Sequence, residues 1–271
     1  MDPQPAAIFF DLDGTILDWQ TGMEKRWLAS IERHNDGSYD PVEMYEMVRK
    51  RRDWFWDDPE RAKTGRMDLN EASRVIVRHA FEDAGLKAVD VANRIGDYYR
   101  AERRELIAPY PGAMETIAAF HARGIRLALL TNGETENQRE SVDKLGLEPY
   151  FDCIVIEGEF GVGKPDERVF RHALEATSST PETAWMVGDS LDADIAPAVE
   201  LGLHAVWVDE AGDGLRRCTH PPRPHYQVNQ RAAIATDKLL STAPCRLAVS
   251  HKPHTGGSHE VRHRPSEHAG V

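Results

Sequence analysis

Short apolar runs that stop abruptly at polar residues constrain the fold of this chain more than any other feature of its sequence. Five such runs occur, at residues 8–10, 127–130, 154–156, 185–187 and 205–208. Apolar runs of this length are typical of strands that are buried on both faces. Segments of helical length separate several of them, at residues 112–123, 135–145 and 167–176. This alternation predicts an α/β fold, a doubly wound, Rossmann-like parallel sheet whose ligands bind beyond the carboxyl ends of the strands.

The stretch from residue 19 to residue 105 breaks the alternation. It contains no strand-like run, and its apolar residues recur with helical spacing, as at Met44, Met47 and Val48. It begins just after the polar loop of the first predicted strand, and the chain leaves it through a turn-rich segment at residues 109–112. We therefore expect residues 19–105 to form an all-helical cap domain, inserted into a core made of residues 1–18 and 106–240.

The C-terminal stretch differs in composition from the rest of the chain. Residues 241–271 are rich in proline, histidine and glycine and contain few apolar residues. Such a segment cannot bury enough apolar surface to offset the entropy lost on ordering. We predict a disordered tail.

Charge and composition limit the partners that this chain can bind. The formal net charge is −12, which disfavours broad contact with nucleic acid or an anionic membrane. An anionic substrate must therefore meet a local positive site. The N-terminus lacks the basic start and long apolar stretch of a secretory signal, and the three cysteines lack the spacing of a zinc or redox motif. These features favour a cytoplasmic protein without a nucleic-acid or membrane partner.

Two aspartates follow the first predicted strand directly. Asp11 and Asp13 are two residues apart, so in extended backbone their carboxylates face the same side. One carboxylate can act as a nucleophile on phosphorus while the other handles the proton of the leaving alcohol. Close carboxylates repel each other unless a cation joins them, which indicates Mg²⁺. The alternatives are a calcium-like loop or a helix cap. Neither explains why the two aspartates directly follow a buried strand.

Two further polar segments follow later strands. Thr131 and Asn132 lie ahead of a helix, where a hydroxyl and backbone amides can hold a phosphate oxygen. Lys164 precedes Pro165 and can present a fixed positive charge to the phosphate and the nucleophile. Taken singly, the first segment also suits a plain turn, and Lys164 also suits an ordinary surface position.

A fourth polar segment places three acids after the strand at residues 185–187. Asp189 is nearest to the strand end and is best placed to share a metal ion with Asp11. Asp194 lies five residues later in the sequence and can hold Lys164 or a metal-bound water in position. The alternative is that these acids simply favour a helix N-terminus.

All four segments occur in order, each at the carboxyl end of its own predicted strand. In this they resemble the haloacid dehalogenase-like (HAD) superfamily, in its subfamily with a helical cap. The corresponding residues are Asp11 and Asp13, Thr131, Lys164, and Asp189 with Asp194. Within the superfamily, residues 129–133, Gln138-Arg139, residues 150–156 and residues 224–226 are similar to the N-acylneuraminate-9-phosphatase and pyrimidine 5′-nucleotidase branch.

The resemblance implies a role for each matching residue. Asp11 would be phosphorylated, and Asp13 would protonate the leaving group and later activate water. Thr131 and Lys164 would bind the phosphoryl group. Mg²⁺ would be held by Asp11, Asp189 and the backbone carbonyl of Asp13.

We therefore expect a Mg²⁺-dependent phosphatase of a small phosphorylated metabolite, with sugar phosphates ahead of nucleoside 5′-monophosphates. A phosphomutase and a non-catalytic phosphate-binding regulator are the other possibilities. True haloacid dehalogenases lack an acid at the position of Asp13, so the presence of Asp13 favours phosphate chemistry.

Three arginines of the cap segment have two possible roles: Arg51, Arg52 and Arg66. They either contact anionic groups of the substrate or lie on solvated helix faces.

Overall fold

The structure, a computed structural model, describes residues 4–208, so the predicted tail and residues 209–240 of the predicted core lie outside the described residues. Its centre is one five-stranded sheet in the order β3-β2-β1-β4-β5, with every neighbouring pair parallel. The strands are β1 (Ala7–Phe10), β2 (Arg126–Thr131), β3 (Cys153–Ile156), β4 (Ala184–Gly188) and β5 (His204–Trp207). The predicted doubly wound parallel sheet is thus confirmed.

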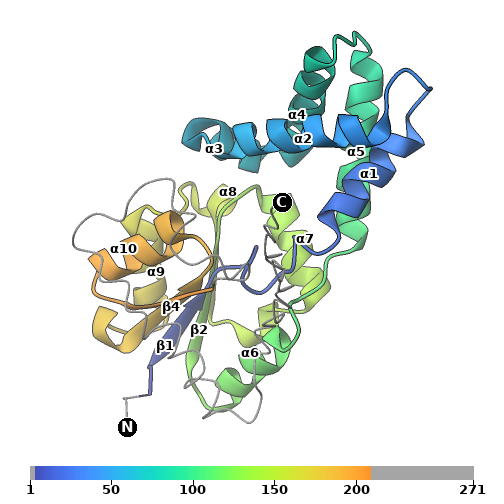
Figure 1. Ribbon diagram of the computed structural model, residues 1–271. Helices are drawn as coiled ribbons and strands as arrows, with labels where there is room; N and C mark the ends of the chain where they lie inside the picture. The colour runs from blue at the N-terminus through green and yellow to red at the C-terminus, as the bar shows by residue number, and fades with distance from the viewer. Residues whose placement is uncertain (1–3, 209–271) are drawn as a thin grey trace, which may run out of the picture.

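Helices cover both faces of this sheet (Figure 1). On one face lie α6 (Ala113–Ala122) and α7 (Thr135–Leu145), and on the other lie α9 (Glu167–Ala176) and α10 (Ala196–Glu200). The short helix α8 (Glu157–Phe160) follows β3 at the carboxyl edge of the sheet (Figure 1). Alternate residues of β1 face opposite layers, because side chains along a strand alternate between faces. Ile8 packs in the hydrophobic cluster that includes Ile117 of α6, whereas Phe9 packs in the cluster that includes Phe170 of α9.

Five further helices lie between β1 and α6: α1 (Met23–Arg33), α2 (Pro41–Trp56), α3 (Pro59–Met67), α4 (Leu69–Asp83) and α5 (Val89–Glu105). Four of them, α1, α2, α4 and α5, share a separate hydrophobic cluster, in which the ring of Trp27 stacks on Tyr99 at a centroid distance of 3.7 Å. Asp40 and Asp58 cap α2 and α3 by accepting backbone N–H groups of the first turn. Figure 1 shows α2 and α3 on the side toward which the strands point.

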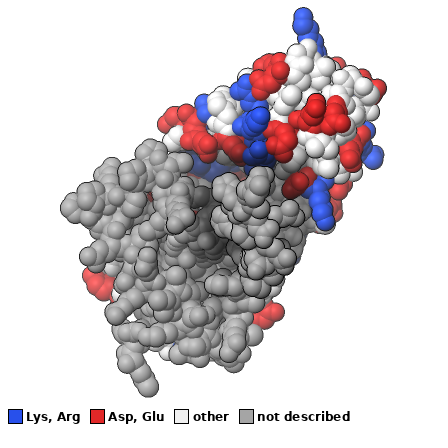
Figure 2. Space-filling view, viewed as in Figure 1, with Lys and Arg blue, Asp and Glu red and all other residues white. Residues whose placement is uncertain are grey.

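The surface of these five helices carries acidic and basic side chains side by side (Figure 2). Arg51 forms an ion pair with Asp83, and Arg52 forms one with Asp53. Both arginines therefore have carboxylate partners on the protein itself. Over residues 4–208, no helix combines the length and the apolar character that crossing a bilayer requires.

Candidate active site

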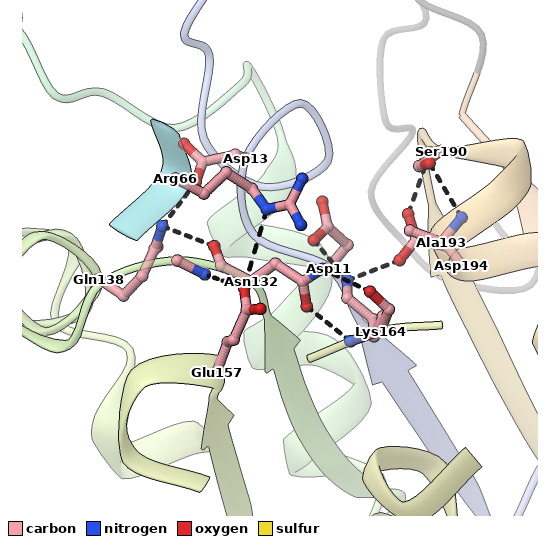
Figure 3. Close-up of polar contacts among 11 residues, drawn as sticks. Asp11, Asp13, Arg66, Asn132, Gln138, Glu157, Lys164, Ser190, Ala193 and Asp194 are labelled. Atoms are coloured by element: carbon pink, nitrogen blue, oxygen red, sulfur yellow. Dashed lines mark hydrogen bonds and ion pairs between the residues drawn. The ribbon is translucent and has the colours of Figure 1, made fainter. Parts of the chain in front are cut away.

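A buried lysine joins two aspartates at the carboxyl edge of the sheet (Figure 3). Asp11 directly follows β1, and its backbone N–H donates to the carbonyl oxygen of Val187. The Nζ of Lys164 donates to Asp11 Oδ1 at 2.7 Å and to Asp194 Oδ1 at 2.6 Å. All three side chains are almost fully buried. The positive charge of Lys164 is thus fixed between two carboxylates that lie far apart in the sequence.

Three carboxylates at this edge are close enough to share a cation. Asp11, Asp189 and Asp194 each offer an oxygen within 4.8 Å of the others. The second oxygen of Asp11, Oδ2, is buried and has no hydrogen-bond partner among the described residues. Carboxylate oxygens are the ligands that Mg²⁺ prefers, so the residues present fit this ion. The side chain of Asp13 is not part of this group.

Two glycines leave the space that these carboxylates occupy. A Cβ atom at Gly14 would lie 2.3 Å from Asp189 Oδ2, and one at Gly188 would lie 2.4 Å from Asp194 Cγ. Asp194 is brought back to this position by the short helical segment Leu191–Ile195, and its Oδ2 accepts the backbone N–H of Ser190 at 3.0 Å. The close packing of backbone and carboxylate explains why glycine stands at both positions.

The burial of these charges shifts their pKa values. Burial raises the pKa of Asp11 from 3.8 to about 7, although the positive charge of Lys164 opposes this rise. Burial and the negative charge of Asp11 raise the pKa of Asp189 to about 8. Burial alone would lower the pKa of Lys164, but the carboxylates of Asp11 and Asp194 raise it above its usual value. The lysine therefore stays charged. When the carboxylates of Asp11, Asp189 and Asp194 are all ionised, their negative charge exceeds the single positive charge of Lys164.

Asp13 has different partners from Asp11. Its Oδ2 accepts a hydrogen bond from Gln138 Nε2 at 3.0 Å, and its Oδ1 lies 3.6 Å from Arg103 Nη2. Gln138 Nε2 also donates to the carbonyl oxygen of Asn132 at 3.1 Å. Neither Gln138 nor Arg103 was predicted to belong to the site. Gln138 contributed only to the family resemblance, and Arg103 lies 90 residues from Asp13, at the end of α5.

The side chain of Asn132 clamps the backbone of Lys164. Its Nδ2 donates to the Lys164 carbonyl oxygen, and its Oδ1 accepts the Lys164 N–H, both at 2.7 Å. Both ends of the amide therefore hold the lysine in place. Direct contact of Asn132 with a substrate stays a prediction. Thr131, the last residue of β2, is buried beside it.

Glu157 is a further polar residue at this edge that the sequence reasoning did not assign. It follows β3, and its Oε2 accepts the backbone N–H of Gly133 at 3.0 Å. The same oxygen lies 3.7 Å from Nε of Arg66, at the end of α3 (Figure 3). The Arg66 carbonyl oxygen also accepts the backbone N–H of Glu134. The helical insertion thus contacts the loop that follows β2. The only signal for Glu157 in the sequence is its place at the end of an apolar run.

The chain is similar in sequence to known proteins. Residues 5–202 match the family of haloacid dehalogenase-like hydrolases. A phosphoserine phosphatase from Thermus thermophilus is 43% identical over 62% of this chain, and the match spans 64% of that protein.

Other relatives match over more of their length. The N-acylneuraminate-9-phosphatase of Mus musculus is 29% identical over 90% of this chain and 97% of that protein. The pyrimidine 5′-nucleotidase YjjG of Escherichia coli is 25% identical over 74% of this chain and 85% of that protein. Among solved structures, the HAD-hydrolase YfnB from Bacillus subtilis, determined bound to magnesium, superposes with a TM-score of 0.60 at 23% identity, covering 82% of this chain and 91% of that one.

Proposed function

Because the chain belongs to the haloacid dehalogenase-like hydrolase family, we propose that it is a Mg²⁺-dependent phosphatase that forms a phosphoryl intermediate on Asp11. The observation that carries this proposal is the contact of Lys164 with both Asp11 and Asp194, while Asp189 lies within reach of a shared cation. Its substrate is a small phosphorylated metabolite. Curated relatives are named for phosphoserine, N-acylneuraminate and pyrimidine 5′-nucleotide substrates, which supports this class. Within it, sugar phosphates are our first candidates.

Asp11 acts as the nucleophile. One of its oxygens is held by Lys164, which fixes the orientation of the carboxylate. Attack of the carboxylate on phosphorus forms the acyl phosphate bond as the ester P–O bond breaks. Lys164 balances the negative charge around the transferred group, in a buried site where charge interactions are strong.

Asp13 moves the proton in both halves of the reaction. In its protonated form it donates to the oxygen of the leaving alcohol, and its carboxylate then takes a proton from the water that attacks the phospho-aspartate. Inorganic phosphate is released and Asp11 is restored. The hydrogen bond from Gln138 keeps the Asp13 side chain in one orientation.

A bound Mg²⁺ would be held by the carboxylates of Asp11 and Asp189 and would neutralise charge on the phosphoryl group. Asp194, which is already bonded to Lys164 and to the Ser190 N–H, keeps the lysine in place.

The proposal is tested by release of phosphate from p-nitrophenyl phosphate by the purified chain. We expect release that depends on Mg²⁺, is abolished by EDTA, and is lost in Asp11→Asn. Asp192→Asn is the matched control, because Asp192 lies on the same edge but is exposed. Turnover by Asp11→Asn at the rate of the unchanged protein would exclude Asp11 as the nucleophile. Full activity in EDTA would exclude the metal.

A further inference from the structure

Four arginines line a cavity beside Asp13. They come from α1 and from the last turns of α5, and we call them the arginine cluster: Arg26, Arg100, Arg103 and Arg104. Asp13 and Gln138 line the same cavity, which has a volume of about 40 Å³. The arginine cluster therefore adjoins the group that we propose to protonate the leaving oxygen.

Arg100 carries a buried charge with little compensation. Its side chain belongs to a residue that is only 5% exposed, and its Nε has no hydrogen-bond partner among the described residues. Within residues 4–208, no carboxylate lies within 4.0 Å of its guanidinium. Its Nη2 makes a single long hydrogen bond, 3.4 Å, to Asn137 Oδ1, which also accepts from Arg104. Burial and the neighbouring Arg103 lower the pKa of Arg100 to about 10, so it remains charged at neutral pH.

Arg26 is partly buried. Its Nε is buried and unpartnered among the described residues, and no ion pair joins it to another residue of that part of the chain. Buried guanidinium groups without an anion are unfavourable, because they lose hydration and gain no partner. Arg51 and Arg52, by contrast, are paired with carboxylates on the surface of the helical insertion.

Among the described residues, none of the acids that line the cavity forms an ion pair with Arg26 or Arg100. Asp18 Oδ1 accepts two backbone N–H groups of the following turn, at 3.1 and 2.8 Å. Glu140 forms its shorter ion pair with Lys144, at 3.0 Å, and lies 3.5 Å from Arg104. The buried Nε donors of Arg100 and Arg26 are thus left without a partner among the described residues.

We infer that the arginine cluster binds a carboxylate of the substrate. The preferred substrates are then small phosphorylated acids, such as the phosphate esters of sugar acids, hydroxy acids or hydroxylated amino acids. This inference rests on the proposed function and narrows its substrate class. Guanidinium groups bind carboxylates through paired hydrogen bonds, and several arginines can share one anion. The cavity is small, which suits a planar carboxylate better than a bulkier second phosphate.

The position of the cluster also limits the length of the substrate. Arg103 Nη2 lies 3.6 Å from Asp13 Oδ1, and Asp13 must reach the ester oxygen. The carboxylate and the phosphate ester therefore lie only a few bonds apart. A short phosphorylated acid satisfies both contacts.

Matched substrate pairs test the inference. O-phosphoserine and O-phosphoethanolamine differ only by the carboxylate, and 3-phosphoglycerate and glycerol 3-phosphate differ by a carboxylate in place of a hydroxymethyl group. We expect kcat/KM to be at least about tenfold higher for the acid of each pair, as one charge-assisted contact supplies about this factor. Arg100→Met should bring the ratio toward one, mainly through KM of the acid, and Arg100→Lys should restore part of it. Arg94→Met, an exposed position on the same helix, should keep the ratio of the unchanged protein.

The outcomes separate the two proposals. Equal kcat/KM for both members of each pair would overturn the carboxylate site, while hydrolysis of p-nitrophenyl phosphate would still support the phosphatase. Preference for fructose 1,6-bisphosphate over fructose 6-phosphate, without preference for the acids, would assign the cluster to a second phosphate and also overturn it. If Arg100→Met does not fold, inhibition of the unchanged protein decides: glycerate should inhibit hydrolysis of p-nitrophenyl phosphate, and equal inhibition by glycerol would contradict the inference.

Discussion

Replacing Asp194 with asparagine should destabilise the protein through one buried hydrogen-bond conflict. Asp194 is 1% exposed, and its two oxygens accept from Lys164 Nζ and from the Ser190 N–H. Asparagine keeps the shape but has only one acceptor, so its amide nitrogen must face one of these two donors. One hydrogen bond is lost, and a buried donor is left unsatisfied.

The expected cost follows from these contacts. A hydrogen bond to a charged group contributes about 1.5–3 kcal/mol, and an unsatisfied buried donor costs about 1–3 kcal/mol. Removing the charge also relieves repulsion, because Asp194 raises the pKa of both Asp11 and Asp189. We expect the free energy of unfolding to fall by about 3 kcal/mol, which lowers Tm by roughly 6–12 °C for a chain of this size.

Urea unfolding followed by far-UV circular dichroism, in EDTA, measures this change. Asp192→Asn is the control, since Asp192 is exposed two residues away and should shift the free energy by less than about 0.5 kcal/mol. A change in Asp194→Asn no larger than that of the control would refute the proposed bonding of Lys164. Phosphatase activity should fall in Asp194→Asn alone.

Three further outcomes are expected. Gly188→Ala should lose about 1–3 kcal/mol of stability, measured by urea unfolding, because the new Cβ would lie 2.4 Å from Asp194 Cγ; unchanged stability would mean that this close approach is absent. Asn132→Ala should lower kcat more than it raises KM in steady-state kinetics, since its two 2.7 Å bonds hold the lysine segment; a change in KM alone would instead place Asn132 on the substrate. Finally, because the pKa values of Asp11 and Asp189 are raised, protonation of these two carboxyl groups stabilises the folded state. This stabilisation is fully present below about pH 3.8 and is lost as the pH rises through about 7 and 8. Mg²⁺ requires the deprotonated forms, so its apparent affinity, measured by calorimetry, should rise at least about tenfold between about pH 6 and pH 8; a flat profile would contradict this.

Much of the fold could be predicted because burial on two faces leaves a strong local signal. The five apolar runs correspond to β1 through β5, and the predicted helices at residues 135–145 and 167–176 coincide with α7 and α9. The predicted superfamily is confirmed by the match over residues 5–202. The nearer likeness to N-acylneuraminate-9-phosphatases and pyrimidine 5′-nucleotidases is confirmed by the relatives of those names. The prediction that the chain is a phosphatase is confirmed, since its curated relatives are named phosphatases.

The contacts around Asp13 could not be predicted, because they join elements that only tertiary packing brings together. Gln138 and Arg103 lie on α7 and α5, where polar residues usually mark a solvated face. Arg100 is almost fully buried on a helix whose sequence gives no reason to expect it. The roles assigned to Asp11, Asp13, Thr131, Lys164 and Asp189, and the boundaries of the helical cap, stay predictions that the experiments above test.

The charges at the edge of the sheet explain why the arginine cluster matters to the proposed reaction. Asp11, Asp189 and Asp194 carry three negative charges when ionised, and Lys164 balances one, which leaves two. A phosphate ester adds up to two more, so a divalent cation alone would not bring the occupied site to neutrality. The protein as a whole has a net charge of −12 and gives no general attraction for an anion. Arg26 and Arg100 supply unpaired positive charge in the cavity beside Asp13. A phosphorylated acid that places its carboxylate in this cavity would also bring its phosphate to the nucleophile. A phosphate ester of an uncharged alcohol would instead leave the arginines without an anion.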